Sequence, residues 1–235
     1  AGAGVNNIPL VKCAEQGIVV FNTPGANANG VKELVVCGML LACRDVVGGI
    51  DWVKSVKDDA GVAKLVEKEK SKFAGTEVAG KTLGIIGMGN IGQSIAGRAV
   101  ACGMKIIYNN RRRLPEEIER RYNAQYVDLE TLLRTSDFVS LNLPYTPDSH
   151  HIINEDTLSM MKQGAVLINT ARGAHIDEAA LVRHLRSGHL YGAALDVYEF
   201  EPHVTPELLE LDNVVLSPHI GTGTIDGRIA MCHCC

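Results

Sequence analysis

Short apolar runs rich in β-branched residues alternate with longer segments of helical pattern along most of this chain. Strands are expected at 18–21, 83–87, 105–108, 138–143, 166–169, 192–196 and 214–216. Helices are expected between them at 29–44, 91–102, 115–121, 129–135, 155–161 and 178–186. Apolar strands that alternate with helices of this length form a parallel sheet covered on both faces. The sequence therefore predicts an α/β fold built on a doubly wound parallel sheet.

The stretch from 51 to 81 breaks this alternation. It is rich in Lys and Glu and holds only sparse apolar residues, among them Trp52 and Phe73. Because Lys and Glu side chains are rarely buried, this stretch is expected at the surface, as one long helix or as a helix with a loop.

The composition excludes several classes of protein. Of the 235 residues, 46% are hydrophobic and 21% are charged, which is typical of a chain with a packed core and not of a disordered one. The longest strongly apolar stretch, 34–43, is far shorter than the roughly 20 residues of a membrane-spanning helix. Asp and Glu (27) outnumber Lys and Arg (23), and the resulting net charge of -4 argues against nucleic acid as a partner.

The seven cysteines indicate a reducing compartment. Their number is odd, and those at 13, 37, 43 and 102 fall inside apolar runs, where a thiol behaves as a small core hydrophobe. The chain begins Ala1-Gly2 without a basic, apolar leader, so no signal peptide is expected. The tail from Cys232 to Cys235 offers metal-type ligands but lacks the spacing of a zinc module. We therefore expect a cytoplasmic protein without a structural metal.

A glycine-rich motif joins one predicted strand to the helix that follows it. From Leu83 the sequence reads LGIIGMGNIG, which is G-x-G-x-x-G between a strand and an amphipathic helix. In this arrangement Gly87 permits a tight turn, Gly89 lets the backbone approach a pyrophosphate, and Gly92 lets the helix pack onto the strand. The anion then lies on the N–H groups and positive dipole of the helix start. The motif predicts a Rossmann-type dinucleotide-binding domain.

The end of the next strand bears on which dinucleotide is bound. A site that prefers NAD carries a carboxylate about 20 residues after the glycines, which accepts the ribose 2′-hydroxyl. This chain has no carboxylate there. It has Asn109, Asn110, Arg111, Arg112 and Arg113. Asn and Arg can bind a 2′-phosphate, so NADP is expected in preference to NAD. Alternatively, the last two arginines merely precede a helix and pair with Glu116 and Glu117.

Three further residues lie where a parallel sheet places its active site, at the carboxyl ends of strands. Arg172, Glu201 and His219 each follow one of the last three predicted strands. A guanidinium can clamp a carboxylate with two hydrogen bonds, and an imidazole exchanges protons near neutral pH. A neighbouring carboxylate would orient that imidazole and favour its protonated form. Together these groups suit the reduction of a 2-oxo acid.

These motifs resemble the D-isomer-specific 2-hydroxyacid dehydrogenase family, which includes phosphoglycerate dehydrogenase and the glyoxylate and hydroxypyruvate reductases. Arg172, Glu201 and His219 lie 29 and then 18 residues apart, downstream of the glycine motif, in the family's order. The resemblance implies that His219 donates a proton to the substrate carbonyl, that Glu201 orients His219, and that Arg172 binds the 2-oxo acid. The cofactor would supply the hydride. The protein would hold the reacting groups in position and supply the electrostatic environment.

The resemblance also implies contacts to substrate and cofactor. Ala3 and Gly4 match the family loop whose backbone amides meet the substrate carboxylate. Asp196 is expected near the nicotinamide amide. The full set of cofactor-binding residues implied by the motif and the family is Gly87, Gly89, Asn90, Ile91, Gly92, Asn109, Asn110, Arg111, Arg112, Pro144, Thr170 and Asp196.

Within the family, two branches compete. Residues 1–45 resemble a bacterial phosphoglycerate dehydrogenase branch, whereas the segment at 109–115 is more similar to the glyoxylate and hydroxypyruvate reductases. The 109–115 segment has a direct consequence for cofactor charge and is weighted more heavily. A glyoxylate or hydroxypyruvate reductase is therefore favoured, with phosphoglycerate dehydrogenase next.

The family comparison also implies a domain division. We expect a remnant of the substrate-binding domain at 1–24, the dinucleotide-binding domain at 25–218 and a truncated return segment at 219–235. Such a piece of a longer chain would bind the cofactor but turn over poorly, because domain closure completes the substrate pocket. Family members usually dimerise, so a homodimer is expected, with 36–66 as its candidate surface.

Two other classes of function remain open. The same fold serves in NAD(P)-binding sensors without turnover, although the absence of an acid at Asn109 fits an NAD sensor poorly. A protein that binds S-adenosylmethionine or S-adenosylhomocysteine could use a similar glycine loop. That alternative leaves Arg172, Glu201 and His219 unexplained.

Overall fold

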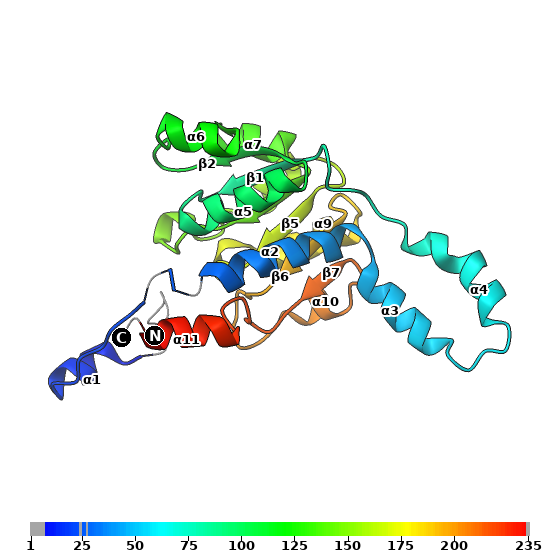
Figure 1. Ribbon diagram of the computed structural model, residues 1–235, viewed down its shortest axis with the longest axis horizontal. Helices are drawn as coiled ribbons and strands as arrows, with labels where there is room; N and C mark the ends of the chain where they lie inside the picture. The colour runs from blue at the N-terminus through cyan, green and yellow to red at the C-terminus, as the bar shows by residue number, and fades with distance from the viewer. Residues whose placement is uncertain (1–7, 24, 27, 234–235) are drawn as a thin grey trace.

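The fold is built around a parallel sheet (Figure 1). The computed structural model describes residues 8–23, 25–26 and 28–233, and seven strands lie among them. These strands are β1 (Thr82–Ile86), β2 (Lys105–Asn109), β3 (Ala124–Tyr126), β4 (Phe138–Leu141), β5 (Val166–Asn169), β6 (Gly192–Leu195) and β7 (Val214–Leu216). Their spatial order is β3-β2-β1-β4-β5-β6-β7, and every neighbouring pair is parallel. The predicted doubly wound α/β fold is confirmed.

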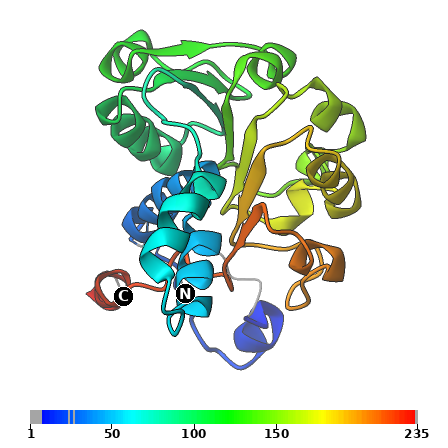
Figure 2. The ribbon, with the colours of Figure 1, turned by 90° about the vertical axis from the view of Figure 1, so that its right-hand side faces the viewer.

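Helices cover both faces of the sheet (Figure 2). Those on one face are α2 (Ala28–Cys43) and α5 (Asn90–Ala101), and those on the other are α7 (Leu129–Thr135), α8 (Glu155–Met160) and α9 (Glu178–Arg186). Strand β1 contributes to both layers of the core, because Leu83 and Ile85 pack with α2 and α5 while Ile86 packs with the opposite layer. A strand buried on both faces is apolar along its whole length, which explains why such strands can be predicted from the sequence.

The remaining helices are shorter or lie at the margins. They are α1 (Leu10–Glu15), α3 (Val46–Ser55), α4 (Val62–Glu69), η1 (Lys70–Phe73), α6 (Glu116–Tyr122), η2 (Pro147–Ser149), η3 (Gly173–His175), α10 (Pro206–Leu209) and α11 (Ile225–His233). Helix α6 leads into β3 at one edge of the sheet, and α10 precedes β7 at the other. Both are connections between neighbouring parallel strands.

The chain changes direction across the sheet between β1 and β4. From β1 it runs outward through β2 to β3, and it then crosses back to β4, which pairs with β1 on the other side. The loops that leave the carboxyl ends of β1 and β4 therefore diverge, and parallel sheets bind ligands in the crevice that this divergence leaves. The fold therefore favours a ligand-binding site between the carboxyl ends of β1 and β4.

Two local expectations were wrong. No strand forms at 18–21, where Ile18, Val19 and Phe21 are 53%, 70% and 62% exposed. Their β-branched and aromatic side chains favour an extended backbone, but no neighbouring strand pairs with this segment in the described structure. Conversely, β3 is a three-residue edge strand that pairs with β2 and was not predicted, because it is too short to show a period.

The segment at 51–81 forms part of a helical arm and not one long helix. Helices α3 and α4 with η1 extend away from the sheet (Figure 1), and Trp52 contacts Phe73 with ring centroids 5.5 Å apart. Helix α3 also exposes Val47, Ile50 and Val53. The predicted homodimer and the predicted domain boundaries stay predictions.

The cysteines are less buried than expected. Cys43 is buried, and its burial raises the pKa of the thiol, but Cys37 and Cys102 are exposed and Cys13 is half-buried. Among the described residues, no helix is long and apolar enough to cross a bilayer, and no group of three or more His, Cys, Asp or Glu side chains could hold a metal ion. Cys234 and Cys235 lie outside the described residues.

Candidate active site

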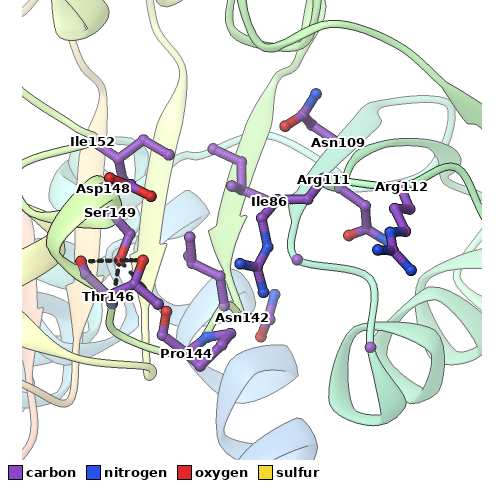
Figure 3. Close-up of a pocket in the computed structure, with 14 residues that line it drawn as sticks. Ile86, Asn109, Arg111, Arg112, Asn142, Pro144, Thr146, Asp148, Ser149 and Ile152 are labelled. Carbon is purple, nitrogen blue, oxygen red and sulfur yellow. Dashed lines mark hydrogen bonds between the residues drawn. The ribbon is translucent and has the colours of Figure 1, made fainter.

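A cleft of about 700 Å³ opens at the switch between β1 and β4 (Figure 3). Asn109, Arg111 and Arg112 lie on one side of it, and Thr146, Asp148, Ser149 and Ile152 lie on the other. The remaining residues of its wall are Ile86, Gly87, Gly89, Asn110, Asn142, Leu143 and Pro144. The predicted cofactor residues at 87, 89, 109–112 and 144 are thus brought together, whereas Asn90, Ile91 and Gly92 lie in the first turn of α5 behind the wall.

The three glycines of the motif meet three different steric demands. Gly87 has φ +94°, and a Cβ there would lie 2.7 Å from the backbone nitrogen of Leu143. At Gly92 a Cβ would lie 2.6 Å from the carbonyl oxygen of Gly87, so the helix could not pack as closely on the strand. At Gly89 a Cβ would meet no atom of the described residues within 4 Å. This open space at the start of α5 is where a pyrophosphate could approach the backbone N–H groups.

Two buried oxygen atoms after β4 and β5 lack a partner among the described residues. Asn142 lines the cleft after β4, and its Oδ1 accepts no hydrogen bond although its Nδ2 donates to Ser140. Thr170 follows β5, and its Oγ1 is also unpartnered. Since buried polar atoms are normally hydrogen-bonded, the Oδ1 of Asn142 favours a polar ligand in the cleft, whereas the predicted cofactor residues Thr170 and Asp196 do not line it. Together with the open space at Gly89, Asn142 fits a dinucleotide.

The loop after β2 uses most of its polar side chains internally. Asn109 Nδ2 donates to the carbonyl of Val127 (2.9 Å), and Asn110 Oδ1 accepts from the backbone N–H of Met88 (2.7 Å), inside the glycine motif. Arg113 donates two hydrogen bonds to Glu119. Within the described structure, only Arg111 and Arg112 of this loop make no ion pair or side-chain hydrogen bond, and both line the cleft.

The alternative pairing of the arginines with Glu116 and Glu117 is wrong. Glu116 pairs with Arg120 and Glu117 pairs with Arg121, each one turn along α6. Arg113 does pair with this helix, but through Glu119. Arg111 and Arg112, which line the cleft, pair with no carboxylate of α6. Pairing with α6 therefore does not account for the presence of these two arginines.

His219 and Glu201 form a hydrogen-bonded pair at the carboxyl edge, beyond β7 and β6. The Nδ1 of His219 lies 3.0 Å from Oε2 of Glu201, and their side chains are 47% and 35% exposed. The other carboxylate oxygen, Oε1, accepts the backbone N–H of Tyr198 (3.0 Å), which fixes the orientation of Glu201. His219 also adopts φ 53°, in the left-handed region that non-glycine residues seldom visit. Such backbone strain is concentrated at functional sites.

Asp196 holds the loop that carries His219. Its carboxylate is 2% exposed and accepts hydrogen bonds from Ser217 Oγ (2.6 Å) and from the backbone N–H groups of Ile220 (2.9 Å) and Gly221 (2.7 Å). The residues on both sides of His219 are therefore tied to one buried carboxylate. This supporting role was not expected from the sequence, and the contact with the nicotinamide amide stays a prediction.

Arg172 lies on the neighbouring loop, after β5. The carbonyl of Arg172 accepts the side-chain N–H of Asn169 (2.9 Å), and a Cβ on the next residue, Gly173, would lie 1.9 Å from the backbone of Tyr198. The loop that carries Arg172 thus packs directly against the segment that leads to Glu201. Among the residues that the structure describes, the guanidinium donates only to the adjacent carbonyl of Ala171 (2.6 Å), so most of its donors remain available.

The buried imidazole of His175, three residues after Arg172, was not singled out in the sequence. It is fully buried, and neither ring nitrogen makes a hydrogen bond of normal geometry to the part of the chain that the structure describes. Burial lowers its pKa, and the charge of Arg172 acts in the same direction. Also missed were the residues of the cleft wall after β4, namely Asn142, Thr146, Asp148, Ser149 and Ile152. The Leu143-Pro144 strand end was the only signal for that wall. Ala3 and Gly4 lie outside the described residues.

Comparison with known proteins settles the family. Residues 36–221 match the model of the D-isomer specific 2-hydroxyacid dehydrogenase NAD binding domain. This chain belongs to that family. The match includes the cleft, the glycine motif, Arg172 and the Glu201–His219 pair.

Relatives within the family differ in their substrates. The chain is 45% identical over 232 residues to a hydroxypyruvate reductase from Thermotoga maritima, covering 97% of this chain and 71% of that protein. A glyoxylate reductase from Paecilomyes thermophila has a TM-score of 0.83 at 43% identity, with 98% and 66% of the two chains covered. Rhodotorula graminis D-mandelate dehydrogenase has a TM-score of 0.85 at 35% identity, with 99% and 67% covered. This chain spans about two thirds of the length of these proteins.

Proposed function

We propose that this chain carries the cofactor site and the proton-transfer pair of an oxidoreductase that moves a hydride between NAD(P)H and a small 2-oxo acid. The observation that carries the proposal is the His219–Glu201 contact on the same sheet edge as the dinucleotide-type cleft. A glyoxylate or hydroxypyruvate reductase activity is favoured over phosphoglycerate dehydrogenase. The similarity to reductases of both substrates supports this choice.

The protein residues have distinct tasks in this reaction. The bound nicotinamide supplies the hydride. His219 has its Nδ1 against Glu201, which leaves Nε2 to donate a proton to the carbonyl oxygen of the substrate. Glu201 holds the ring in that orientation and balances the positive charge when the ring is protonated. Arg172 clamps the carboxylate of the 2-oxo acid, together with the backbone of Ala3 and Gly4.

The cofactor preference follows from charge at the cleft. The adenosine end would lie against Asn109, Arg111 and Arg112, where no carboxylate among the described wall residues on that side would repel a 2′-phosphate. The pyrophosphate would lie over Gly89, and Pro144, Thr170 and Asp196 would border the nicotinamide half. NADPH is therefore preferred over NADH.

Steady-state assays on this chain and on a longer protein that contains it test this function directly. The loss of reduced-nicotinamide absorbance is followed with NADPH and NADH in turn, with glyoxylate, hydroxypyruvate and 3-phosphohydroxypyruvate as substrates. We expect the fastest turnover with NADPH and one of the first two acids, and loss of that turnover in His219→Asn. Calorimetric titration with NADPH accompanies each assay. Cofactor binding without turnover by this chain, with turnover by the longer protein, would mean that this chain is a cofactor-binding piece of a dehydrogenase. No turnover by either protein would instead favour a binding-only function.

A further inference from the structure

The loop from 110 to 114 is anchored at both of its ends. At the first end, Asn110 accepts the N–H of Met88 through its side chain, and its carbonyl accepts the hydroxyl of Tyr126 (3.3 Å). At the other end, the backbone N–H of Leu114 donates to the hydroxyl of Tyr108 (2.9 Å). Between the anchors lie the two arginines that face the cleft, followed by Arg113. The conformational freedom of this short span is therefore small.

Glu119 organises the second anchor. Its carboxylate is only 7% exposed and accepts two hydrogen bonds from Arg113, at 2.9 and 2.8 Å, and one from the Tyr108 hydroxyl at 2.6 Å. The same hydroxyl accepts the N–H of Leu114. One buried carboxylate on α6 is thus joined to a side chain of the loop and, through one hydroxyl, to the loop backbone.

The protonation states of Glu119 and Tyr108 preserve these hydrogen bonds across the physiological pH range. The hydrogen bonds from Arg113 and Tyr108 lower the pKa of Glu119 to about 2, and burial raises the pKa of Tyr108 to about 12. Glu119 is therefore charged and Tyr108 is neutral at any physiological pH. A fork of two hydrogen bonds between a guanidinium and a carboxylate is also strongly directional.

We propose that Glu119 is a positioning residue for cofactor selection, which keeps Arg111 and Arg112 at the cleft by holding Arg113 and Tyr108. It acts in two ways. It withdraws the third cation of the Arg111–Arg113 run from the cleft, and it fixes the backbone on the far side of the two that remain. Glu119 touches no ligand itself. This inference rests on the proposed preference for NADPH, because the group that the two arginines would bind is its 2′-phosphate.

Two small nucleotides isolate the 2′-phosphate. Adenosine 2′,5′-bisphosphate and adenosine 5′-monophosphate differ only in that group, and neither needs the nicotinamide or a substrate. Their dissociation constants are measured by calorimetry for the unaltered chain, Glu119→Gln and Tyr108→Phe. Glu116→Gln is the matched control, since Glu116 lies on the same helix in an exposed pair with Arg120. Circular dichroism melting checks that each variant is folded.

The expected result is a change in preference and not in overall affinity. The unaltered chain should prefer the bisphosphate, and Glu119→Gln should reduce that preference about tenfold while binding of the monophosphate stays nearly constant. Tyr108→Phe should reduce it about threefold, because the clamp on Arg113 survives. Glu116→Gln should change nothing.

Each other outcome has a definite meaning. An unchanged or increased preference in Glu119→Gln, or a loss of affinity that is equal for both nucleotides, would overturn the role of Glu119 and leave the NADPH proposal intact. If Glu119→Gln does not fold, Tyr108→Phe decides, since it keeps the ring and removes only the hydroxyl. No preference in the unaltered chain would overturn the NADPH proposal and the role of Glu119 with it.

Discussion

The carboxyl edge of the sheet has two halves that are supported differently. In the cofactor half, beside β1 and β2, Arg111 and Arg112 are held between anchors formed by Asn110 and by buried Glu119. In the catalytic half, beyond β6 and β7, the side chains of His219 and Glu201 are 47% and 35% exposed. Buried Asp196 accepts hydrogen bonds from the backbone of the loop that carries His219. In both halves the side chains that would meet a ligand are accessible, and a buried carboxylate sets their position.

The difference lies in what each carboxylate holds. Glu119 binds a guanidinium and a hydroxyl, so its anchor is made of side chains. Asp196 accepts two backbone N–H groups, so it fixes the path of the chain itself. The two halves should therefore fail independently, one in cofactor selection and the other in proton transfer.

The largest effect is expected from His219. In a longer protein that contains this chain, His219→Asn should lower kcat by about 10²- to 10⁴-fold, because the proton donor is lost, while the dissociation constant for NADPH changes little. Steady-state kinetics and calorimetry on the same preparation measure the two quantities. His203→Asn is the control, since His203 is an exposed histidine two residues from Glu201. A loss of cofactor affinity as large as the loss of kcat would show that the two halves are not separable.

The double substitution Arg111→Ala with Arg112→Ala tests the cofactor half. It should weaken NADPH by about 10- to 100-fold relative to NADH, because only NADPH offers a 2′-phosphate to these cations. Dissociation constants for both cofactors, measured at one salt concentration, give the ratio. Arg120→Ala removes an exposed arginine from the adjacent helix as a control. Equal weakening of both cofactors would contradict the assignment of NADPH.

Patterns that depend on neighbouring residues predicted most of the fold. Six of the seven described strands and the main helices follow from apolar runs and helical spacing, because the central strands β1, β4, β5 and β6 are buried on both faces. The failures have local causes. The 18–21 run is strand-like in composition, but no strand among the described residues pairs with it, and β3 is only three residues long.

The site was predictable where one residue type performs one task. The glycines act through the absence of a Cβ, and Arg172, Glu201 and His219 have their proposed roles in their own side chains and spacing, so all of them could be proposed from the sequence. Glu119 and Asp196 act through partners 6 to 25 residues away, and only the folded chain brings those partners together. Asn142 and Thr170 could not be recognised from the sequence either. Folding buries their side-chain oxygen atoms, and only then does the lack of a hydrogen-bond partner among the described residues become apparent.

Two glycine substitutions separate helix packing from pyrophosphate binding in the cofactor half. Gly92→Ala should destabilise the fold by about 1–3 kcal/mol, because its methyl group would press against the carbonyl of Gly87. Gly89→Ala places the methyl in open space with φ -78°, so stability should change by less than about 0.5 kcal/mol. That methyl would obstruct the pyrophosphate, and NADPH and NADH should weaken alike. Urea unfolding and calorimetry separate the two effects, and similar stability losses for both variants would contradict the packing argument.

The smallest effect concerns acid sensitivity in the catalytic half. Burial lowers the pKa of His175 below its ordinary value of 6.5, so the unfolded chain binds a proton more readily than the folded chain. This contribution to stability is present above pH 6.5 and is lost as the pH falls below it. His175→Leu should therefore reduce the drop in melting temperature between about pH 7.5 and about pH 5.5, whereas His203→Leu, at an exposed position, should leave it unchanged. An identical drop in His175→Leu and the unaltered chain would mean that the imidazole is already hydrated in the fold. The packing of the loop after Arg172 would then be looser than the close approach of Gly173 to Tyr198 requires.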